Sequence, residues 1–516
     1  MTEPTAPAVP STTGPVCHTD QWIGGRWTAS LATEQLAVTD PSTGQLLATV
    51  PSGCAADADR AARAAADAFP VWSTTPIRQR LAALGRITAG LERHAEQLAD
   101  TITAEVGAPV RLARHTQVGL AIGMAAHSAQ VLETFAFEER VGHSLVVREP
   151  AGVAACITPW NMPLLLTVQK VLPALAAGCT VIHKPSELTP LHARLFAQIM
   201  AEAELPPGVF NMVVGTGPQA GAALAAHPAV DLVSLTGSVR AGREVSVLGA
   251  DTVKRVHLEL GGKGASLVLA DADLEAAVRE TVDRVCFNSG QACLQWSRLL
   301  VPREQHDEAV RIADEAMAQY VVGDPRDPAT DLGPLVSEAG RDRVAGYLRA
   351  GVDGGADLVR GGTERPVGLE HGHYVTPTLF AGVDPASCIA QEEIFGPVLC
   401  VIPHDGEDDA VHIANDTRYG LHSGVWAGDD AHAVRVARRL RTGVVDINGA
   451  GFNPAAPFGG FKQSGIGREC GAAGLAGYLE TKSLQLPQEN TGPLTGPRLK
   501  DTTAPAPARE AERNAR

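Results

Sequence analysis

The segment CFNSGQACLQWSR, residues 286–298, holds two cysteines, and the second of them, Cys293, has no histidine close to it in the sequence. A thiol with a pKa near ~8.5 is mostly protonated at neutral pH, yet it is intrinsically a strong nucleophile that can add to a carbonyl carbon. Such an addition needs no dedicated histidine, whereas a papain-like hydrolase uses one. The alternative role for a single cysteine is a small buried hydrophobic residue. We expect that role for Cys286, which lies in the apolar stretch TVDRVCF.

Two other residues have types and positions that suit acid–base and electrostatic catalysis. Glu259 ends the apolar segment VHLEL, between Leu258 and Leu260, where partial desolvation would raise its pKa toward that of a useful general base. Asn161 in PWNMP carries an amide donor that could stabilise a developing oxyanion, an effect worth ~3–4 kcal/mol per donor. The alternatives are a solvated charge for the glutamate and a turn residue for the asparagine.

Two glycine-rich stretches are candidates for phosphate binding. VVGTGPQAG contains Gly215, Gly217 and Gly221 and is one residue too long for the usual dinucleotide fingerprint, so its pattern alone indicates a turn. LTGSVRAGRE lacks the Gly-Lys-Ser/Thr of a nucleoside-triphosphate loop. Its Gly237 and Ser238 stand where a strand passes into a helix, and they could present N–H groups and a hydroxyl to a phosphate or simply cap the helix.

These residues belong to an alternating pattern of short apolar strands and helices that begins near residue 150. The segments VAACIT, TVIHK, VFNMVVG, DLVSLTG and VHLELGG read as strands separated by helices, which predicts an α/β fold with a mostly parallel sheet. Ligands of such sheets bind at the carboxyl ends of the strands. A second alternating region runs from about 262 to 470, and Ala-rich helices are expected at 55–69 and 77–99, after short strands around WIGGRW.

Length and composition limit the class of protein. A chain of 516 residues is long enough for two or three domains, and a formal charge of −15 argues against nucleic acid or an anionic membrane as a partner. We therefore expect small-molecule partners. Nine scattered cysteines without zinc-ligand spacing indicate a reduced, cytoplasmic protein and no metal site. The N-terminus has no signal-peptide pattern, and no apolar run reaches membrane-spanning length.

Six blocks, taken together, resemble the aldehyde dehydrogenase superfamily over residues 20–485. They are PWNMPLLLTVQKVLPALAAGCTVIHKPSELTP, LTGSVRAGRE, LELGGKGA, FNSGQACLQWSR, EEIFGPV and PFGGFKQSGIGRE. The resemblance implies a Rossmann-like parallel-sheet cofactor domain, a second α/β catalytic domain and a small β oligomerisation element. The corresponding ranges are 20–133 with 150–261 for the NAD-binding domain, 262–470 for the catalytic domain, 134–149 with 471–487 for the oligomerisation strands, and 1–19 and 488–516 for disordered tails.

The resemblance also implies a catalytic cycle. Cys293 would be the nucleophile, Asn161 the oxyanion donor and Glu259 the general base, with Lys170 as a further catalytic residue. The implied reaction is NAD-dependent oxidation of an aldehyde to a carboxylic acid, through a cysteine thiohemiacetal and a thioester that water resolves. No metal is needed in this scheme.

For the cofactor, the resemblance implies NAD in preference to NADP. Glu187, beside Lys184, would bind the adenine-side ribose and repel a 2′-phosphate, although the Lys184 cation could tolerate one. Glu393 and Phe395 would hold the nicotinamide ribose, with Trp160 and Ser238 near the pyrophosphate. The complete set of expected cofactor residues is Thr158, Trp160, Lys184, Ser186, Glu187, Gly217, Gly221, Thr236, Gly237, Ser238, Leu260, Gly261, Glu393 and Phe395.

The residues that match the family's substrate tunnel contain no Arg or Lys, so a carboxylated semialdehyde lacks an evident anchor. Met162 and Gln169 stand where aromatic residues are frequent in the family, which suggests a roomy apolar channel for medium-chain aliphatic or aromatic aldehydes. Whether Trp296 lines it is left open. The expected tunnel residues are Met162, Leu165, Leu166, Gln169, Leu294, Phe452 and Phe458.

Three alternative functions and the oligomeric state also follow from the resemblance. An NADP-linked or a CoA-acylating semialdehyde dehydrogenase would use another cofactor or acyl acceptor, but the acylating branch generally lacks the base that Glu259 supplies. A non-catalytic family member has no support, because the expected catalytic residues are all present. Residues 140–150 and 478–487 resemble oligomerisation strands, so we expect a homodimer or homotetramer.

Overall fold

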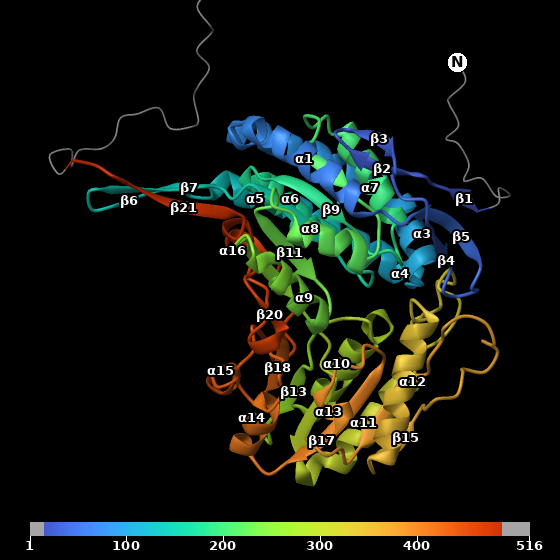
Figure 1. Cartoon of the computed structure of the whole chain (residues 1–516). Coiled ribbons are helices and arrows are strands. Elements are labelled where there is room, and N and C mark those ends of the chain that lie inside the picture. The colour runs from blue at the N-terminus through green and yellow to red at the C-terminus, as the bar shows by residue number, and fades with distance from the viewer. Residues whose placement is uncertain (1–14, 488–516) are drawn as a thin grey trace, which may run out of the picture.

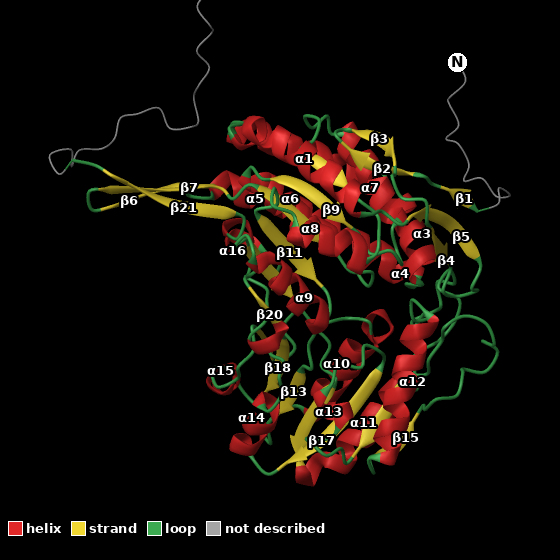
Figure 2. Ribbon diagram, viewed as in Figure 1, coloured by secondary structure: helices red, strands yellow, loops and turns green. Residues whose placement is uncertain are grey.

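The computed structural model describes residues 15–487, which form two large sheets covered by helices and two small three-stranded sheets (Figure 1). The expected α/β class is confirmed, and the parallel strands alternate with helices in both large sheets. Figure 2 shows the two large sheets one above the other, with a narrow ribbon of strands projecting from the upper half.

The first large sheet has eight strands, five of them mutually parallel. In order across the sheet they are β20 (Gly465–Ile466), β12 (Arg255–Glu259), β11 (Leu232–Thr236), β8 (Val153–Ile157), β9 (Thr180–Lys184), β10 (Phe210–Met212), β2 (Asp20–Ile23) and β3 (Arg26–Ala29). From β8 the chain winds outward through β9 and β10, and then returns to the other side of β8 to form β11 and β12. This reversal creates a switch point between β8 and β11, where ligands of such sheets bind.

Both faces of this sheet are buried, which explains its continuous apolar strands. Successive residues of β8 point to opposite faces, so that Ala155 packs toward one helical layer and Cys156 toward the other. The first layer contains α1 (Ala55–Ser73), α8 (Ala222–Ala226) and α9 (Val239–Ala250), and the second contains α2 (Ile77–Arg93), α3 (Ala95–Val106), α5 (Gly119–Thr134), α6 (Pro163–Ala177) and α7 (Leu191–Glu202). The single helix expected at 77–99 is thus two helices, because the backbone leaves the helix at His94.

The second large sheet has seven strands and its own buried cores on both faces. Across the sheet they are β15 (Asp357–Arg360), β16 (Thr378–Ala381), β17 (Val398–His404), β14 (Arg298–Pro302), β13 (Ala265–Val268), β18 (His422–Trp426) and β19 (Val444–Ile447). One face is covered by α10 (Leu274–Cys286) and α11 (His306–Met317), and the other by α12 (Glu338–Asp353), α13 (Cys388–Gln391), α14 (Glu407–Asn415) and α15 (Asp430–Ala437).

The two small sheets lie at opposite sides of the first large sheet (Figure 1). One contains β1 (Val16–Cys17), β5 (Leu46–Pro51) and β4 (Gln35–Thr39), and the projecting one contains β21 (Leu479–Gln485), β7 (Ser144–Pro150) and β6 (Glu138–Val141). The remaining short elements are α4 (Val110–Leu112), η1 (Ala113–Val118), η2 (Gly217–Gly221), η3 (Phe287–Gly290), η4 (Arg303–Gln305), η5 (Lys462–Ser464) and α16 (Gly471–Ala476).

Three segments differ from what the sequence led us to expect. Strand β1 lies within the expected N-terminal tail, whose first fourteen residues, like the expected tail 488–516, are outside the described residues. Residues 471–476 form a helix rather than a strand, with Leu475 buried against the first core. Strand β20 pairs with β12 of the first sheet although it follows the second sheet in sequence. Gly465 permits this pairing, because its φ is +149° and a Cβ there would lie 2.0 Å from the Leu258 carbonyl oxygen.

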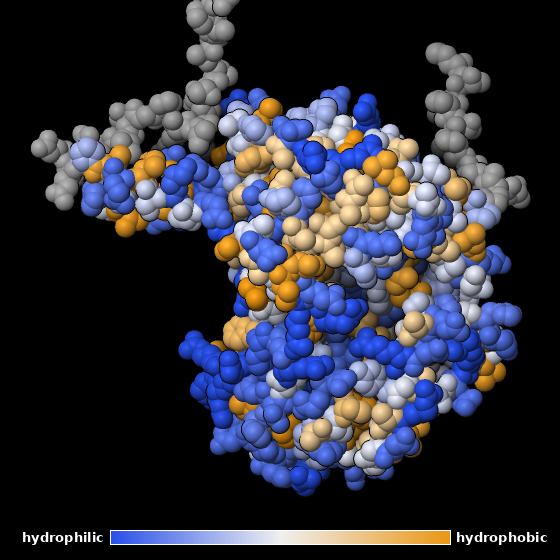
Figure 3. Space-filling model, viewed as in Figure 1, coloured by the Kyte–Doolittle hydropathy of each residue, from blue (hydrophilic) through white to orange (hydrophobic). Residues whose placement is uncertain are grey.

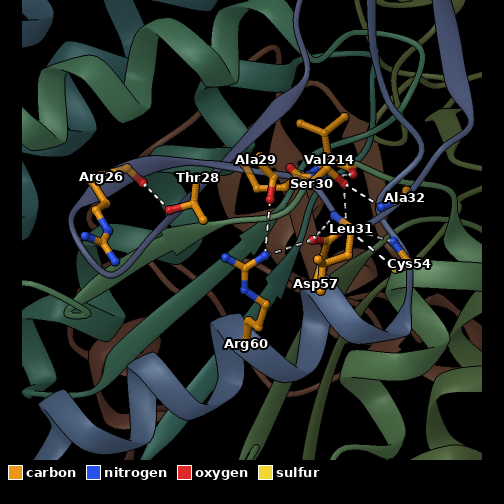
Figure 4. A network of polar contacts seen from close by, with 11 residues as sticks. Arg26, Thr28, Ala29, Ser30, Leu31, Ala32, Cys54, Asp57, Arg60 and Val214 are labelled. Atoms are coloured by element: carbon orange, nitrogen blue, oxygen red, sulfur yellow. Dashed lines mark hydrogen bonds and ion pairs between the residues drawn. The ribbon is translucent and has the colours of Figure 1, made fainter.

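A buried carboxylate fixes the start of α1 to the end of β3 (Figure 4). Asp57 accepts hydrogen bonds from the Ser30 hydroxyl at 2.6 Å, from the Leu31 N–H at 2.9 Å and from the Cys54 N–H at 3.3 Å. The Cys54 N–H is a free donor at the helix N-terminus, where the negative charge is also favourable, and the other two bonds tie the carboxylate to the segment after β3. They hold α1 in the position from which its alanine face packs on the first sheet.

The exposed surface differs between the two halves of the molecule. In Figure 3 the half that carries the second sheet is largely hydrophilic on the face shown, whereas hydrophobic residues are more frequent on the upper half. Among residues 15–487, no helix combines the length and apolar character that crossing a membrane requires.

Candidate active site

Cys293 lies in the loop between η3 and β14, and a strained turn precedes it. Asn288, Ser289 and Gly290 have φ angles of 51°, 55° and 73°, a left-handed conformation that non-glycine residues rarely adopt. A Cβ on Gly290 would lie 2.0 Å from the carbonyl carbon of Gly396, so the turn requires glycine. The conformation directs the cysteine loop into the region between the two large sheets.

The thiol of Cys293 is half-buried, within reach of the charges of Glu259 and Glu393, of which only Glu393 also lines one of the cavities described below. Burial raises the pKa of this thiol above its ordinary value, and the negative charges of Glu259 and Glu393 raise it further. A raised pKa favours the protonated thiol over the thiolate, so its addition to a carbonyl requires a proton acceptor. Burial also raises the pKa of Cys286, which ends α10 within the second core and faces no cavity described below.

Glu259 ends β12 and is 5% exposed, as the apolar sequence around it predicts. Its Oε1 atom has no hydrogen-bond partner in the described chain. Burial raises the pKa of this carboxyl well above its usual range, the charge of Glu469 raises it further, and the Lys170 cation opposes both effects. A carboxyl with a raised pKa and a free oxygen can accept a proton near neutral pH.

Lys170 lies on α6, and its ammonium group forms a buried ion pair with Glu469. The Lys170 Nζ atom also donates to the Ser234 hydroxyl at 3.2 Å. Lys170 was among the expected catalytic residues, whereas Glu469 was not expected at the site. The available signal was its position at the end of the block PFGGFKQSGIGRE, because a carboxylate inside a matched block is a candidate partner for a buried lysine.

The side-chain amide of Asn161 is buried in the loop that follows β8. Its Nδ2 atom donates to the Gln291 carbonyl oxygen at 2.9 Å, which uses one of its two N–H groups. Its own backbone carbonyl accepts hydrogen bonds from Asn288 at 3.0 Å and Gln117 at 3.3 Å. These contacts tie the β8 loop to the cysteine loop and place the amide where it lines the same cavities as Cys293.

Two cavities meet at Cys293 and Asn161, which line both of them. The larger has a volume of about 1090 Å³ and the smaller about 560 Å³. A molecule in each cavity would therefore contact the thiol from a different side. This is the arrangement needed for a reaction between two bound molecules at one nucleophile.

The larger cavity brings together all seven residues expected to form a substrate tunnel. Trp296 does not line it, because this side chain is fully buried in the second core. Further lining residues come from α5, α10 and neighbouring segments, which were not expected here because only packing brings them to the cavity. The additional lining residues are Thr116, Leu120, Met124, Glu280, Asp283, Arg284, Phe287 and Ala292.

The smaller cavity lies at the switch point of the first sheet, between the loops after β8 and β11. Its lining includes eight of the expected cofactor residues together with Pro159 and Arg343. The eight are Trp160, Thr236, Gly237, Ser238, Leu260, Gly261, Glu393 and Phe395. The Trp160 and Phe395 rings meet edge to face with their centroids 5.4 Å apart.

Several features of this cavity suit a dinucleotide. The buried Thr236 hydroxyl has no partner in the described chain and is available to a ligand. Glu393 accepts the Gly262 N–H at 2.9 Å and lies so close to Gly261 that a Cβ there would be 2.1 Å from its carboxylate. Ser238 caps α9, whose N-terminal dipole favours a phosphate.

The other six expected cofactor residues lie outside the lining of this cavity. Lys184 ends β9, and its ammonium group is 3.3 Å from Glu187. Burial lowers the pKa of Lys184, an effect that the Glu187 charge opposes. Gly221 of η2 faces the Lys184 stem, since a Cβ there would be 3.8 Å from Cδ. The full set outside the cavity is Thr158, Lys184, Ser186, Glu187, Gly217 and Gly221.

No cluster of three or more potential metal-binding His, Cys, Asp or Glu side chains occurs in residues 15–487.

Comparisons with known proteins relate nearly the whole described chain to one family. The model of the aldehyde dehydrogenase family matches residues 27–484. Among curated relatives, a 3-succinoylsemialdehyde-pyridine dehydrogenase from a Pseudomonas species is 47% identical over 464 residues, which cover 90% of this chain and 97% of the relative. Among solved structures, one is a mutant of aldehyde dehydrogenase C from Pseudomonas syringae in complex with NAD⁺ and octanal. It superposes on this chain with a TM-score of 0.90 and is 47% identical in sequence, and the match covers 90% of this chain and 96% of that chain. Mycobacterium tuberculosis aldehyde dehydrogenase, solved with NAD⁺, also has a TM-score of 0.90 at 40% identity, with coverage of 93% and 100%.

Proposed function

The chain belongs to the aldehyde dehydrogenase family, and from this premise we propose that it oxidises uncharged medium-chain aliphatic or aromatic aldehydes to carboxylic acids with NAD. The observation that carries the proposal is the meeting of two cavities at Cys293 and Asn161. One cavity has the lining expected for a dinucleotide, and the other has a largely apolar lining suited to an aldehyde tail.

In the first half of the cycle the thiol adds to the aldehyde. The Cys293 sulfur forms a bond to the carbonyl carbon, and its proton passes to a base, for which the nearby raised-pKa carboxyl of Glu259 is suited. The Asn161 amide and the Cys293 backbone N–H would then hold the oxyanion, an interaction worth ~3–4 kcal/mol per donor. Bound NAD would supply the acceptor for the hydride that leaves the carbon, so that a thioester remains on Cys293.

In the second half water resolves the thioester. Glu259 first releases the proton of the thiol to solvent and then takes a proton from water, which attacks the acyl carbon. The carbon–sulfur bond breaks, the carboxylic acid departs, and the proton on Glu259 returns to the sulfur and regenerates the thiol. The presence of Glu259 in a buried position beside the thiol supports water, rather than CoA, as the acyl acceptor. Lys170 and Glu469, which form an ion pair, would act by shifting the pKa of Glu259 and would not themselves react.

The residues of the smaller cavity fit NAD. Glu393 and Phe395 would hold the nicotinamide ribose, while Thr236, Gly237, Ser238 and Trp160 would approach the pyrophosphate. Leu260 and Gly261 would form part of the same site, and Lys184 with Glu187 would hold the adenine-side ribose. The Glu187 carboxylate favours ribose hydroxyls over a 2′-phosphate, which supports NAD over NADP.

The larger cavity supports an apolar substrate. Each methylene buried there stabilises the complex by up to ~0.8 kcal/mol until the cavity is filled. A structure of 47% identity contains octanal, and a relative of 47% identity is named for a succinoylsemialdehyde-pyridine. Both names fit a cavity that accepts an aliphatic chain or an aromatic ring.

We also propose that the chain forms homo-oligomers and works in the cytoplasm. In the projecting sheet, β6 and β21 each have one strand neighbour within the described chain, so their outer edges can pair with a second copy. The nine cysteines, none of them in a disulfide in the described structure, suit a reducing compartment.

An aldehyde panel with each cofactor tests the function. We expect NADH formation with hexanal, octanal and benzaldehyde, and smaller specificity constants with succinate semialdehyde or with NADP. Activity that depends on CoA, or a semialdehyde preferred over every uncharged aldehyde, would overturn the assignment.

A further inference from the structure

Arg284 is the only arginine or lysine among the residues that line the larger cavity in the described part of the chain. It lies on α10 together with Glu280 and Asp283, which line the same cavity. Asp283 is exposed and the Glu280 side chain is 33% exposed, whereas Asn161 at the reacting end is buried. The charged wall therefore belongs to the open part of the cavity, where the tail of an aldehyde would lie.

The charge of Arg284 is already engaged by protein groups. Its Nε atom donates to the Glu280 carboxylate at 2.7 Å, and one terminal nitrogen is 3.5 Å from the buried Asp446 carboxylate. The same nitrogen donates to the Ala450 carbonyl oxygen at 3.3 Å, and the guanidinium carbon lies 4.9 Å from the centre of the Trp296 ring. These contacts engage the Nε edge and one terminal nitrogen of the guanidinium, so the Nε side that would otherwise bind a carboxylate in a fork is already occupied by Glu280.

Asp283 adds a second negative charge to this wall. Its carboxylate accepts a hydrogen bond from the Tyr320 hydroxyl, which leaves the charge itself uncompensated. Glu280, Asp283 and Arg284 together carry a net negative charge. An aldehyde whose tail ends in a carboxylate would lose hydration in the cavity and meet this repulsion without gaining a free cation.

We propose that the Glu280–Arg284 pair, with Asp283, is the element that selects substrates by charge, admitting neutral tails and rejecting ω-carboxylates. The inference rests on the proposed function and adds the residues that determine its substrate class. Removal of the Glu280 charge should therefore free the Nε side of Arg284 to bind a substrate carboxylate. The preference of the enzyme should then shift toward semialdehydes.

The test compares Glu280→Gln with wild type on succinate semialdehyde and octanal. The ratio of the two specificity constants should rise about tenfold in favour of the semialdehyde, which corresponds to ~1.4 kcal/mol. The double variant Glu280→Gln/Arg284→Gln should lose this gain, because the released cation is then absent. Glu275→Gln is the matched control, since it breaks the 3.0 Å Glu275–Arg279 pair on the same helix outside the cavity and should leave the ratio unchanged.

Asp283→Asn is a second variant that tests the same charge selection if Glu280→Gln folds poorly. It removes one repulsive charge without touching Arg284, so the same ratio should rise by a smaller factor. An unchanged ratio in both variants overturns the inference, as does an equal gain in Glu275→Gln. If wild type oxidises none of the panel aldehydes with NAD, the proposed function fails instead, and the two failures are therefore distinguishable.

Discussion

Lys170 and Glu469, which are 299 residues apart in the sequence, form an ion pair inside the core beside the candidate base Glu259. Both partners are buried, and a buried pair of this kind is destabilising if either partner is lost alone. The two charges act on Glu259 in opposite directions, because Glu469 raises its pKa and Lys170 lowers it. The packing that brings Lys170 and Glu469 together therefore also influences the pKa of Glu259.

Glu469→Gln should shift the pH dependence of turnover. Glu259 acts as a base only when ionised, so the rate rises with pH as this carboxyl loses its proton. Without the Glu469 charge the pKa of Glu259 falls, and the rise should move to lower pH. Steady-state rates measured across pH check this, with Glu275→Gln as the control. A rise that moves to higher pH would contradict the assigned coupling.

Cys293→Ala should abolish NADH formation, with a loss of at least roughly 10³-fold, because the carbonyl carbon then has no nucleophile. Cys286→Ala should retain near-normal rates, since that thiol is buried in the second core away from both cavities. Initial rates with octanal compare the two variants. Near-normal activity in Cys293→Ala, or inactivity in Cys286→Ala alone, would refute the assignment of the nucleophile.

Glu259→Gln should slow both steps for which Glu259 is the proposed base, the thiol addition and the hydrolysis of the thioester. Glutamine retains the size of glutamate but cannot take a proton, so steady-state turnover should fall by about 10²–10⁴-fold. If another acceptor takes the thiol proton, a first turnover of NADH should precede the stall, with the acyl group trapped on Cys293. Rapid mixing and intact-mass measurement detect both events. Normal turnover in the variant would exclude Glu259 as the base.

Glu187→Gln should weaken the preference for NAD. Removal of its charge relieves repulsion of a 2′-phosphate and leaves Lys184 without its 3.3 Å partner, so the NADP-to-NAD ratio of specificity constants should rise about tenfold. Glu308→Gln, which alters the exposed 2.7 Å ion pair with Arg311 on α11, is a control for general charge effects. A wild type that prefers NADP would contradict the cofactor assignment, and an unchanged ratio in Glu187→Gln would show that another residue discriminates.

Local patterns were sufficient for much of this protein. The alternation of short apolar strands with helices predicted both large sheets, because periodicity and turn residues act over a few positions. The blocks around Cys293, Glu259 and Asn161 identified the candidate catalytic residues, and all seven expected tunnel residues line one cavity. The sequence therefore determined the fold class, named the candidate reacting groups and predicted the apolar part of the cavity lining.

Only the tertiary structure decided which distant groups meet. The pairing of Lys170 with Glu469, the addition of β20 to the first sheet and the entry of Arg284 into the tunnel wall depend on how helices and sheets pack. In sequence Arg284 belongs to an ordinary charged helix, and its i,i+4 bond to Glu280 looks like any exposed pair. Its position in the wall follows from the face of α10 that the second core buries, since local sequence sets the helix and long-range burial sets its orientation.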